Sequence, residues 1–471
     1  MRIRQYILTL GLLAGVLLLT ACQNDVLSVE TAEDTEQPVA RSVDGSFLNL
    51  HIVNNVEAVT RATAVGSAVE NAIYDGILVI FKGNGESSAT LQSAVVIDQL
   101  INNPGTSASV DIIQRLPEGT HPYPASGAGK LYVMALLNTT ATGLSVSNNM
   151  LYLNGTSLSG YTRAQLQGAV INAVGSTEQH VGLYMASKPK GTGSTPQQTA
   201  IQIYDPTAAT PSQYLYDRQE DITASSSKLT LNVERAAAKV SIANAATTIT
   251  SINLNGSGSS HPTVHRMTWT PNNYYTQCYA ISGGSGATIT PSTFTATDFS
   301  LYPQRSLSGD AVYIGEGSTD IIVEVLLKDG SFLMDDCYAF YPLNDTFTEN
   351  SFHDLYTSAS QFVAYLKSGW IWQRAGYDLS TRSADDIYGN MKIEMDANGT
   401  VTVTFTMDTT GYTSAETAGL ARLKAFLESH TKGFRNGKMY YTYTVNPIER
   451  NNAYSLTLQA TSIAGIGRPA P

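Results

Sequence analysis

Cysteine is scarce in this sequence, and so are the short motifs that mark common enzymes. The chain has three cysteines in 471 residues and no Cys-x-x-Cys pair, which excludes a zinc ribbon and a thioredoxin-type redox site. The His-Glu-x-x-His pattern of metalloproteases and the Gly-x-Ser-x-Gly pattern of serine hydrolases do not occur either. The sequence therefore predicts no metal, no cofactor and no enzymatic activity.

Charge is also low, and positive charge is the scarcer sign. Charged residues make up 14% of the chain and the net charge is -11. Proteins that bind nucleic acid need basic patches for the phosphates, so nucleic acid is excluded as a partner. Many Ser, Thr and Tyr residues, 26 of them Tyr, accompany the low charge. That composition favours β-sheet surfaces.

Long apolar runs are missing except at the start of the chain. Arg2 and Arg4 precede an apolar run over Tyr6–Leu19, and the run ends at Ala21 and Cys22. A bilayer-spanning helix needs about 20 apolar residues, so this shorter run favours a signal peptide over a transmembrane anchor. The small residues before Cys22 form a lipobox. We predict cleavage between Ala21 and Cys22 and attachment of diacylglycerol to the Cys22 thiol.

Residues 1–22 are thus the predicted signal peptide, and the protein is predicted to reach the cell surface as a lipoprotein. The next stretch, Gln23–Glu36, is acidic and has few apolar residues. It cannot build a core, and we expect it to be a disordered tether.

Alternating apolar residues dominate the rest of the chain. The segment Ser46–Val53 places Leu48, Leu50 and Ile52 on one face of a predicted strand. Further strands are expected at 74–82, 131–137, 182–187, 200–204, 229–242 as one continuous run, 266–270, 320–328, 332–341, 391–394, 400–407, 438–445 and 454–463. The clearest helix is Ser414–Ser429, which has leucines at helical spacing.

Many short strands separated by turn residues predict a mainly β protein of Greek-key β-sandwiches with a few short helices. We place an N-terminal sandwich domain at 62–227 and a C-terminal one at 228–471. Two cysteines remain after lipidation, Cys278 and Cys337. An oxidising compartment would allow a disulfide between them, and two free buried thiols are the open alternative.

The chain resembles the fimbrillins of Bacteroidales type V pili, in the branch of the minor-fimbrium structural subunit. Four features in order carry this resemblance. They are the lipobox at Cys22, the strand 46–53 followed by Arg61 and the run 74–82, the segment Val233–Val240 (VERAAAKV), and the closing segments 438–443, 449–458 and 462–467.

The resemblance implies two transthyretin-like β-sandwich domains and a particular route of assembly. Members of the family travel as outer-membrane lipoproteins and are cut by an Arg-specific extracellular protease. The cut removes the first strand, and a strand from the next fimbrial subunit fills the groove that it leaves. Residues 23–61 would then be a tether plus a removable strand built on Leu48, Leu50 and Ile52, and the mature protein would lie in an extracellular fimbrium.

Arg61 is the predicted cleavage site, which would make Ala62 the mature N-terminus. Arg61 follows the alternating strand and lies in a stretch of small residues, 59–63. Arg41 is the rival, but a cut there would leave the strand attached. The alternative for Arg61 is an ordinary solvated surface residue.

The C-terminus departs from the usual family pattern, because the sequence ends soon after Ile463 with two prolines in its last residues. Prolines make a poor hydrogen-bonding strand. The expectation is a subunit at the fimbrial tip, with a host or bacterial surface ligand, or else a donor made from 453–463 itself. The competing function is a surface lipoprotein that binds a glycan or a protein, or a pilus anchor subunit; both would keep the lipid.

One short motif is typical of modification in exported Bacteroidales proteins. Asp408-Thr409-Thr410 fits their O-glycosylation pattern. The alternative is that these residues are buried at the end of a strand.

Overall fold

The computed structural model of the chain describes most residues from Ser46 to Thr457. The described ranges are 46–54, 70–102, 109–117, 129–173, 182–188, 199–210, 212–243, 248–250, 252–293, 299, 304–306, 310–340, 354–369, 371–374 and 376–457. Within them the chain is mainly β with a few helices, which confirms the predicted class at that level. None of the described helices is long and apolar enough to cross a membrane.

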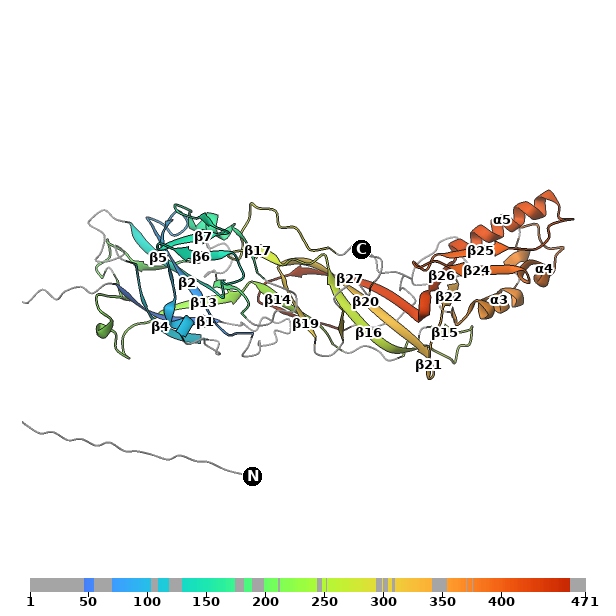
Figure 1. Ribbon diagram of the computed structural model, residues 1–471, viewed down its shortest axis with the longest axis horizontal. Helices are drawn as coiled ribbons and strands as arrows, with labels where there is room; N and C mark the ends of the chain where they lie inside the picture. The colour runs from blue at the N-terminus through green and yellow to red at the C-terminus, as the bar shows by residue number, and fades with distance from the viewer. Residues whose placement is uncertain are drawn as a thin grey trace, which may run out of the picture. The chain divides into compact units, whose positions relative to one another are not determined.

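The largest sheet has nine strands in the order β12-β1-β13-β10-β5-β2-β3, with β4 paired to β1 and β11 paired to β5. Figure 1 shows several of these strands in the blue to green part of the ribbon. Their bounds are β1 (Phe47–Asn54), β2 (Gly76–Gly83), β3 (Thr90–Val96), β4 (Ser109–Arg115), β5 (Lys130–Leu137), β10 (Met185–Ser187), β11 (Ile201–Tyr204), β12 (Leu215–Tyr216) and β13 (Leu229–Arg235).

Strands β2 and β5 are buried on both faces, so their apolar side chains serve two separate clusters. Alternate residues of a strand point to opposite faces of the sheet. In β2, Val79 and Phe81 face one cluster, and Leu78 and Ile80 face the other. Continuous apolar runs at 76–81 and 131–137 are therefore what a doubly covered pair of strands requires.

The cluster on the side of Val79 and Phe81 is closed by smaller elements. These are β6 (Leu144–Ser147), β7 (Met150–Leu153), β8 (Thr156–Ser157), α2 (Arg163–Gln167), β9 (Val170–Asn172) and β17 (Gln277–Tyr279). Thr162 caps the start of α2 through a reciprocal pair of hydrogen bonds with Gln165. The other cluster, around Leu78, includes β1, β4 and β13, with α1 (Asp98–Asn102) beside them.

The expected single strand over 229–242 is two strands, β13 and β14 (Ala237–Ala243), separated by Ala236. The Ala236 amide donates to the Tyr184 carbonyl at 2.9 Å, so the ladder changes partners there. Strand β13 pairs with β1 and β10, whereas β14 pairs with β19 (Ala311–Gly315) and β28 (Ala453–Thr457). The continuous-strand prediction was wrong because alternation reports burial and not a change of sheet. The domain division at 228 stays a prediction.

Strand β14 and the strands after it form several smaller sheets. Strand β14 lies between β19 and β28, and β20 (Gly317–Asp329) lies between β16 (Thr263–Asn272) and β27 (Lys438–Ile448). The 332–341 strand prediction covers two strands, because β21 pairs with β20 whereas β22 pairs with β23 and β26. The remaining bounds are β15 (Asn253–Leu254), β18 (Arg305–Ser306), β21 (Phe332–Leu333), β22 (Cys337–Phe340), β23 (Asp354–Tyr356) and β26 (Thr431–Phe434).

A separate core joins helices and a hairpin between β22 and β26. Figure 1 shows α5 beside the β24–β25 hairpin in the orange-red part of the ribbon, and their side chains share one cluster. Helix α5 has the predicted bounds, Ser414–Ser429, and Thr413 caps it in a reciprocal pair with Glu416. The other elements are α3 (Ala359–Ser368), α4 (Ala384–Tyr388), β24 (Met391–Met395) and β25 (Val401–Phe405), with short 3-10 turns at 219–221, 371–373 and 435–437.

Candidate functional site

Strand β1 is the candidate site, because the sequence predicts that it is removable and the structure places it inside the largest sheet. It runs parallel to β13 and antiparallel to β4, and its first residues also pair with β12. Leu50 lies opposite Leu229 on one side and Ile112 on the other. Both edges of β1 are therefore hydrogen-bonded, and its loss would leave two unpaired strand edges.

The predicted apolar face of β1 is fully buried. Leu48, Leu50 and Ile52 each have a relative exposure of 0%. They pack in the cluster that also holds Ile73, Leu78, Ile80, Leu100, Ile112, Val133, Leu229 and Leu231. Each such side chain contributes about 1.5–3 kcal/mol by leaving water. Removal of β1 would thus open an apolar slot lined by these residues.

The outer face of β1 makes polar contacts with the segments on either side. The Asn49 Nδ2 donates to the carbonyls of Ser226 and Ser227 at 3.4 and 3.3 Å. His51 Nδ1 lies 2.6 Å from a carboxylate oxygen of Asp111, and Lys228 Nζ lies 2.7 Å from the other. The hydrogen bonds from Lys228 and then from His51 lower the pKa of Asp111. This exposed cluster adds little stability but orients the outer face.

The last residue of β1, Asn54, contacts the chain again just after the segment 55–69. Asn54 Nδ2 donates to Asn71 Oδ1 at 3.2 Å, and both side chains are buried. The two ends of the 55–69 segment therefore meet. Arg61 and Ala62 lie in that segment, and Ala21, Cys22 and Arg41 lie before Ser46, so all five positions fall outside the described residues.

A buried acid holds the chain directly after this segment. Glu70 accepts hydrogen bonds from Lys239 Nζ at 2.7 Å and from the Tyr313 hydroxyl, and Arg235 lies 3.9 Å away. Burial, followed by the bond to Glu70, raises the pKa of Tyr313. These partners come from β13, β14 and β19, so Glu70 fixes the start of residues 70–75 independently of β1.

The two cysteines expected either to pair or to remain free are both free. Cys278 and Cys337 are fully buried in different hydrophobic clusters, so a disulfide between them would require the two clusters to merge. Burial raises the pKa of the Cys278 thiol to about 12 and also raises that of Cys337. Both thiols stay protonated at neutral pH and are poor nucleophiles.

The predicted glycosylation motif lies on a turn and is exposed. Asp408 accepts from the amide and hydroxyl of Thr410 at 2.8 and 2.6 Å, and these bonds lower the pKa of the carboxyl. The alternative of burial at a strand end is therefore wrong. The Thr409 side chain is accessible.

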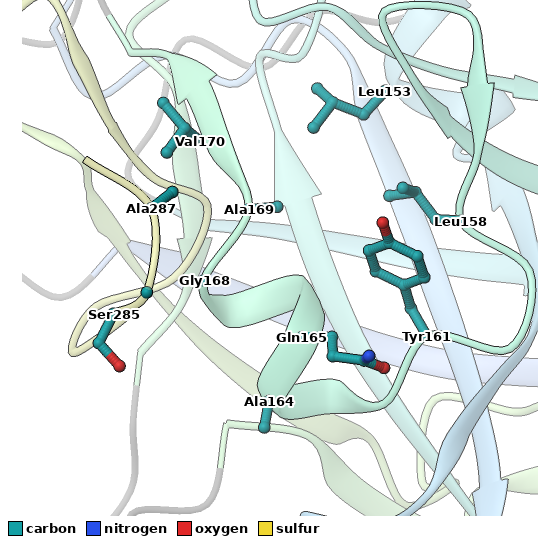
Figure 2. Close-up of a pocket in the computed structure, with 11 residues that line it drawn as sticks. Leu153, Leu158, Tyr161, Ala164, Gln165, Gly168, Ala169, Val170, Ser285 and Ala287 are labelled. Atoms are coloured by element: carbon teal, nitrogen blue, oxygen red, sulfur yellow. The ribbon is translucent and has the colours of Figure 1, made fainter. Parts of the chain in front are cut away.

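An open pocket of about 590 Å³ lies beside α2. Figure 2 shows Leu153, Leu158 and Tyr161 on one side of it and Val170, Ala287 and Ser285 on the other. Tyr161, Gln165 and Ser285 supply polar side chains, and the described lining has no carboxylate, imidazole, thiol or amine. Across the described ranges, moreover, no cluster of three or more His, Cys, Asp or Glu side chains could hold a metal ion.

The sequence located the apolar face of β1 but not the polar residues around it. Asn54, Asn71 and Glu70 become a group only when β1, β13, β14 and β19 meet. No local periodicity marks such contacts, because their members come from elements that are far apart in sequence.

Comparisons with solved structures found proteins of the cell surface. One is a protein assigned to cell adhesion from Parabacteroides distasonis (16% identity, 62% of this chain and 78% of that chain, TM-score 0.35). Others are a fimbrial assembly protein from the same species (10%, 61% and 82%, 0.30) and the tip fimbrial protein Mfa3 from Porphyromonas gingivalis (7%, 61% and 82%, 0.25). No family model and no curated protein matches.

These similar structures are named for adhesion and fimbriae. None of the three is named as an enzyme. The identities and TM-scores are low, so the geometry of β1 carries the proposals that follow.

Proposed function

We infer that this chain is a structural subunit of a cell-surface fimbria that assembles by exchange of a strand. In this proposal the precursor is exported as a lipoprotein on Cys22 and cut after Arg61 by an Arg-specific protease. Strand β1 then leaves, and a strand of a neighbouring subunit enters between β13 and β4. The mature protein needs no enzymatic activity.

The burial of β1 is the observation that supports this proposal most strongly. A strand with three fully buried aliphatic residues and two paired edges belongs to the fold, yet it precedes the predicted cut. Each backbone hydrogen bond that a donor restores contributes about 0.5–1.5 kcal/mol. Strand addition would therefore be strongly favoured over an empty slot.

Strand β28 is the candidate donor within this chain. Among the described strands, β28 pairs with β14. Its apolar side chains Tyr454 and Leu456 are only half-buried. The turn before it is firmly held, because buried Arg450 contacts Glu316 at 2.8 Å and the Tyr279 carbonyl at 3.1 Å. If β28 leaves its sheet, the chain would therefore bend just after this turn, which stays in place. The competing proposal, a tip subunit that only accepts a strand, predicts that β28 never leaves.

Limited proteolysis of the purified precursor tests the proposal. Treatment with an Arg-specific protease should give a new N-terminus at Ala62 and, after incubation, a ladder of oligomers on a native gel. An Arg61→Ala precursor should stay monomeric, whereas the matched Arg41→Ala precursor should behave like the wild type. A tip subunit would be cut in the same way but would form a ladder only when a donor subunit is added.

A different outcome would favour the competing function. If filaments or cells carry the protein with its lipid still on Cys22 and with Leu48–Ile52 retained, strand exchange at this slot does not occur. The chain would then be an anchor subunit or a surface-bound lipoprotein that binds a glycan or a protein.

A further inference from the structure

Strand β1 buries two asparagines in addition to its aliphatic residues. Asn49 and Asn54 are each 3% exposed, which is unusual for polar side chains without a catalytic role. Asn49 lies on the outer face of the strand, and Asn54 ends the inner face that begins with Leu48. A replacement strand must therefore satisfy a polar requirement on each face.

Both asparagines act as hydrogen-bond donors. Asn49 donates to two main-chain carbonyls, Ser226 and Ser227, and Asn54 donates to the side-chain oxygen of Asn71. The Asn54 Oδ1 has no partner among the described residues. In each contact the amide nitrogen is the donor, so the incoming strand needs a side chain that places an N–H group at the same point.

Position 51, which lies between the two asparagines, should accept a wider range of side chains. His51 is half-exposed, and its partner Asp111 is also held by Lys228, which lies outside β1. Asp111 therefore keeps a cation when His51 is gone. A donor strand needs no particular residue opposite Asp111.

Alternation of apolar residues alone does not fix the register of an incoming strand. A shift of one residue turns the aliphatic side chains outward, but a shift of two residues restores them to the core face. The two donor positions are five residues apart in sequence and lie on opposite faces, so a two-residue shift would move both away from their acceptors. The polar contacts of Asn49 and Asn54 therefore distinguish the correct register from one that is shifted by two residues.

We propose that the β1 slot selects a partner strand with aliphatic residues at the positions of Leu48, Leu50 and Ile52 and with short hydrogen-bond donors at the positions of Asn49 and Asn54. The two donors set the register of the incoming strand. This inference rests on the proposed exchange of β1 and names the chemistry of the strand that replaces it. The occupant is a β-strand of another fimbrial subunit.

Competition with labelled peptides on the full chain tests the register. A protease site substituted at residues 59–63 allows the chain to be cut regardless of Arg61, and fluorescence anisotropy then follows entry of a peptide of residues 46–54. The Asn54→Leu and Asn49→Leu peptides should bind about tenfold more weakly, because each loses the hydrogen bonds that a buried amide makes. Hydrophobicity alone predicts the reverse, since leucine is similar in size and more apolar.

Matched peptides separate this inference from the exchange itself. His51→Ala should bind within about twofold of the parent peptide, whereas Leu50→Asn should not bind. Equal or tighter binding of the two leucine peptides would overturn the register inference and leave the slot intact. Failure of the parent peptide to enter, or entry of Leu50→Asn as readily as the parent, would overturn the exchange.

A change on the other side of the contact gives a second measurement. In a chain with Asn71→Leu, the Asn54→Leu peptide should lose most of its penalty, because that chain has no Asn71 oxygen for Asn54 to donate to. A penalty that persists unchanged would show that Asn54 acts through shape and would contradict its role as a donor to Asn71.

Discussion

Strands β1 and β28 come from opposite ends of the described chain, and each runs parallel to one of two consecutive strands. Strand β1 pairs with β13 and β28 pairs with β14, and only Ala236 separates β13 from β14. Their surroundings differ. Strand β1 has a second neighbour in β4 and a fully buried apolar face, while β28 leaves Tyr454 and Leu456 half exposed.

The difference indicates how tightly the fold holds each strand. Apolar area removed from water dominates the free energy of strand association. A fully buried strand with two partners should be slow to leave, and a half-buried strand should exchange readily. The comparison therefore favours β1 as the strand whose place must be refilled and β28 as a strand able to move.

Truncation of leucine gives the largest expected contrast. Leu50→Ala should lower the free energy of unfolding by about 2–5 kcal/mol, because it leaves a cavity in the core. Leu456→Ala should lower it by less than about 1 kcal/mol, since its site is partly solvated. Urea denaturation of both variants measures the difference. Equal losses of unfolding free energy would contradict the difference inferred between β1 and β28.

The anchor after the predicted cut gives an intermediate effect. Glu70→Ala should destabilise the chain by about 2 kcal/mol, because it leaves Lys239 and Arg235 without their buried carboxylate. The exposed ion pair between Glu220 and Arg218 offers a control, and Glu220→Ala should cost less than about 0.5 kcal/mol. Thermal unfolding of the two variants compares them. A Glu70 variant as stable as the control would mean that the start of the mature chain is held by other contacts.

Lowering the pH should give the smallest difference between β1 and β28. Lys228 and His51 lower the pKa of Asp111, so the stabilising contribution of this carboxylate is present above about pH 4 and is lost as the pH falls below that. Strand β28 carries no residue that titrates in this range. After cleavage, release of the β1 fragment should be modestly faster at pH 3 than at pH 7, and Asp111→Asn should remove that part of the pH dependence. Size-exclusion chromatography of the cut chain measures the release.

The exposed motif adds a covalent prediction away from either strand. If the protein is glycosylated at Thr409, intact mass spectrometry of the exported protein should show a glycan that is absent from Thr409→Ala. A control variant, Thr404→Ala, changes an exposed threonine of β25 and should keep the added mass.

The sequence by itself determined the features that repeat locally. Alternation of Leu48, Leu50 and Ile52 identified a strand with one apolar face, and the leucine spacing in 414–429 identified α5 with its bounds. Composition established the mainly β class. Each of these follows from side-chain periodicity, which a short window of sequence contains.

Only the tertiary structure decided what these elements pair with. It placed β1 between β13 and β4, divided 229–242 at Ala236, kept Cys278 and Cys337 in separate clusters, and brought Asn54 to Asn71. Such contacts join residues that are distant in sequence or flank a long segment. Their free energy depends on packing that forms once the chain is folded, so no local pattern encodes them.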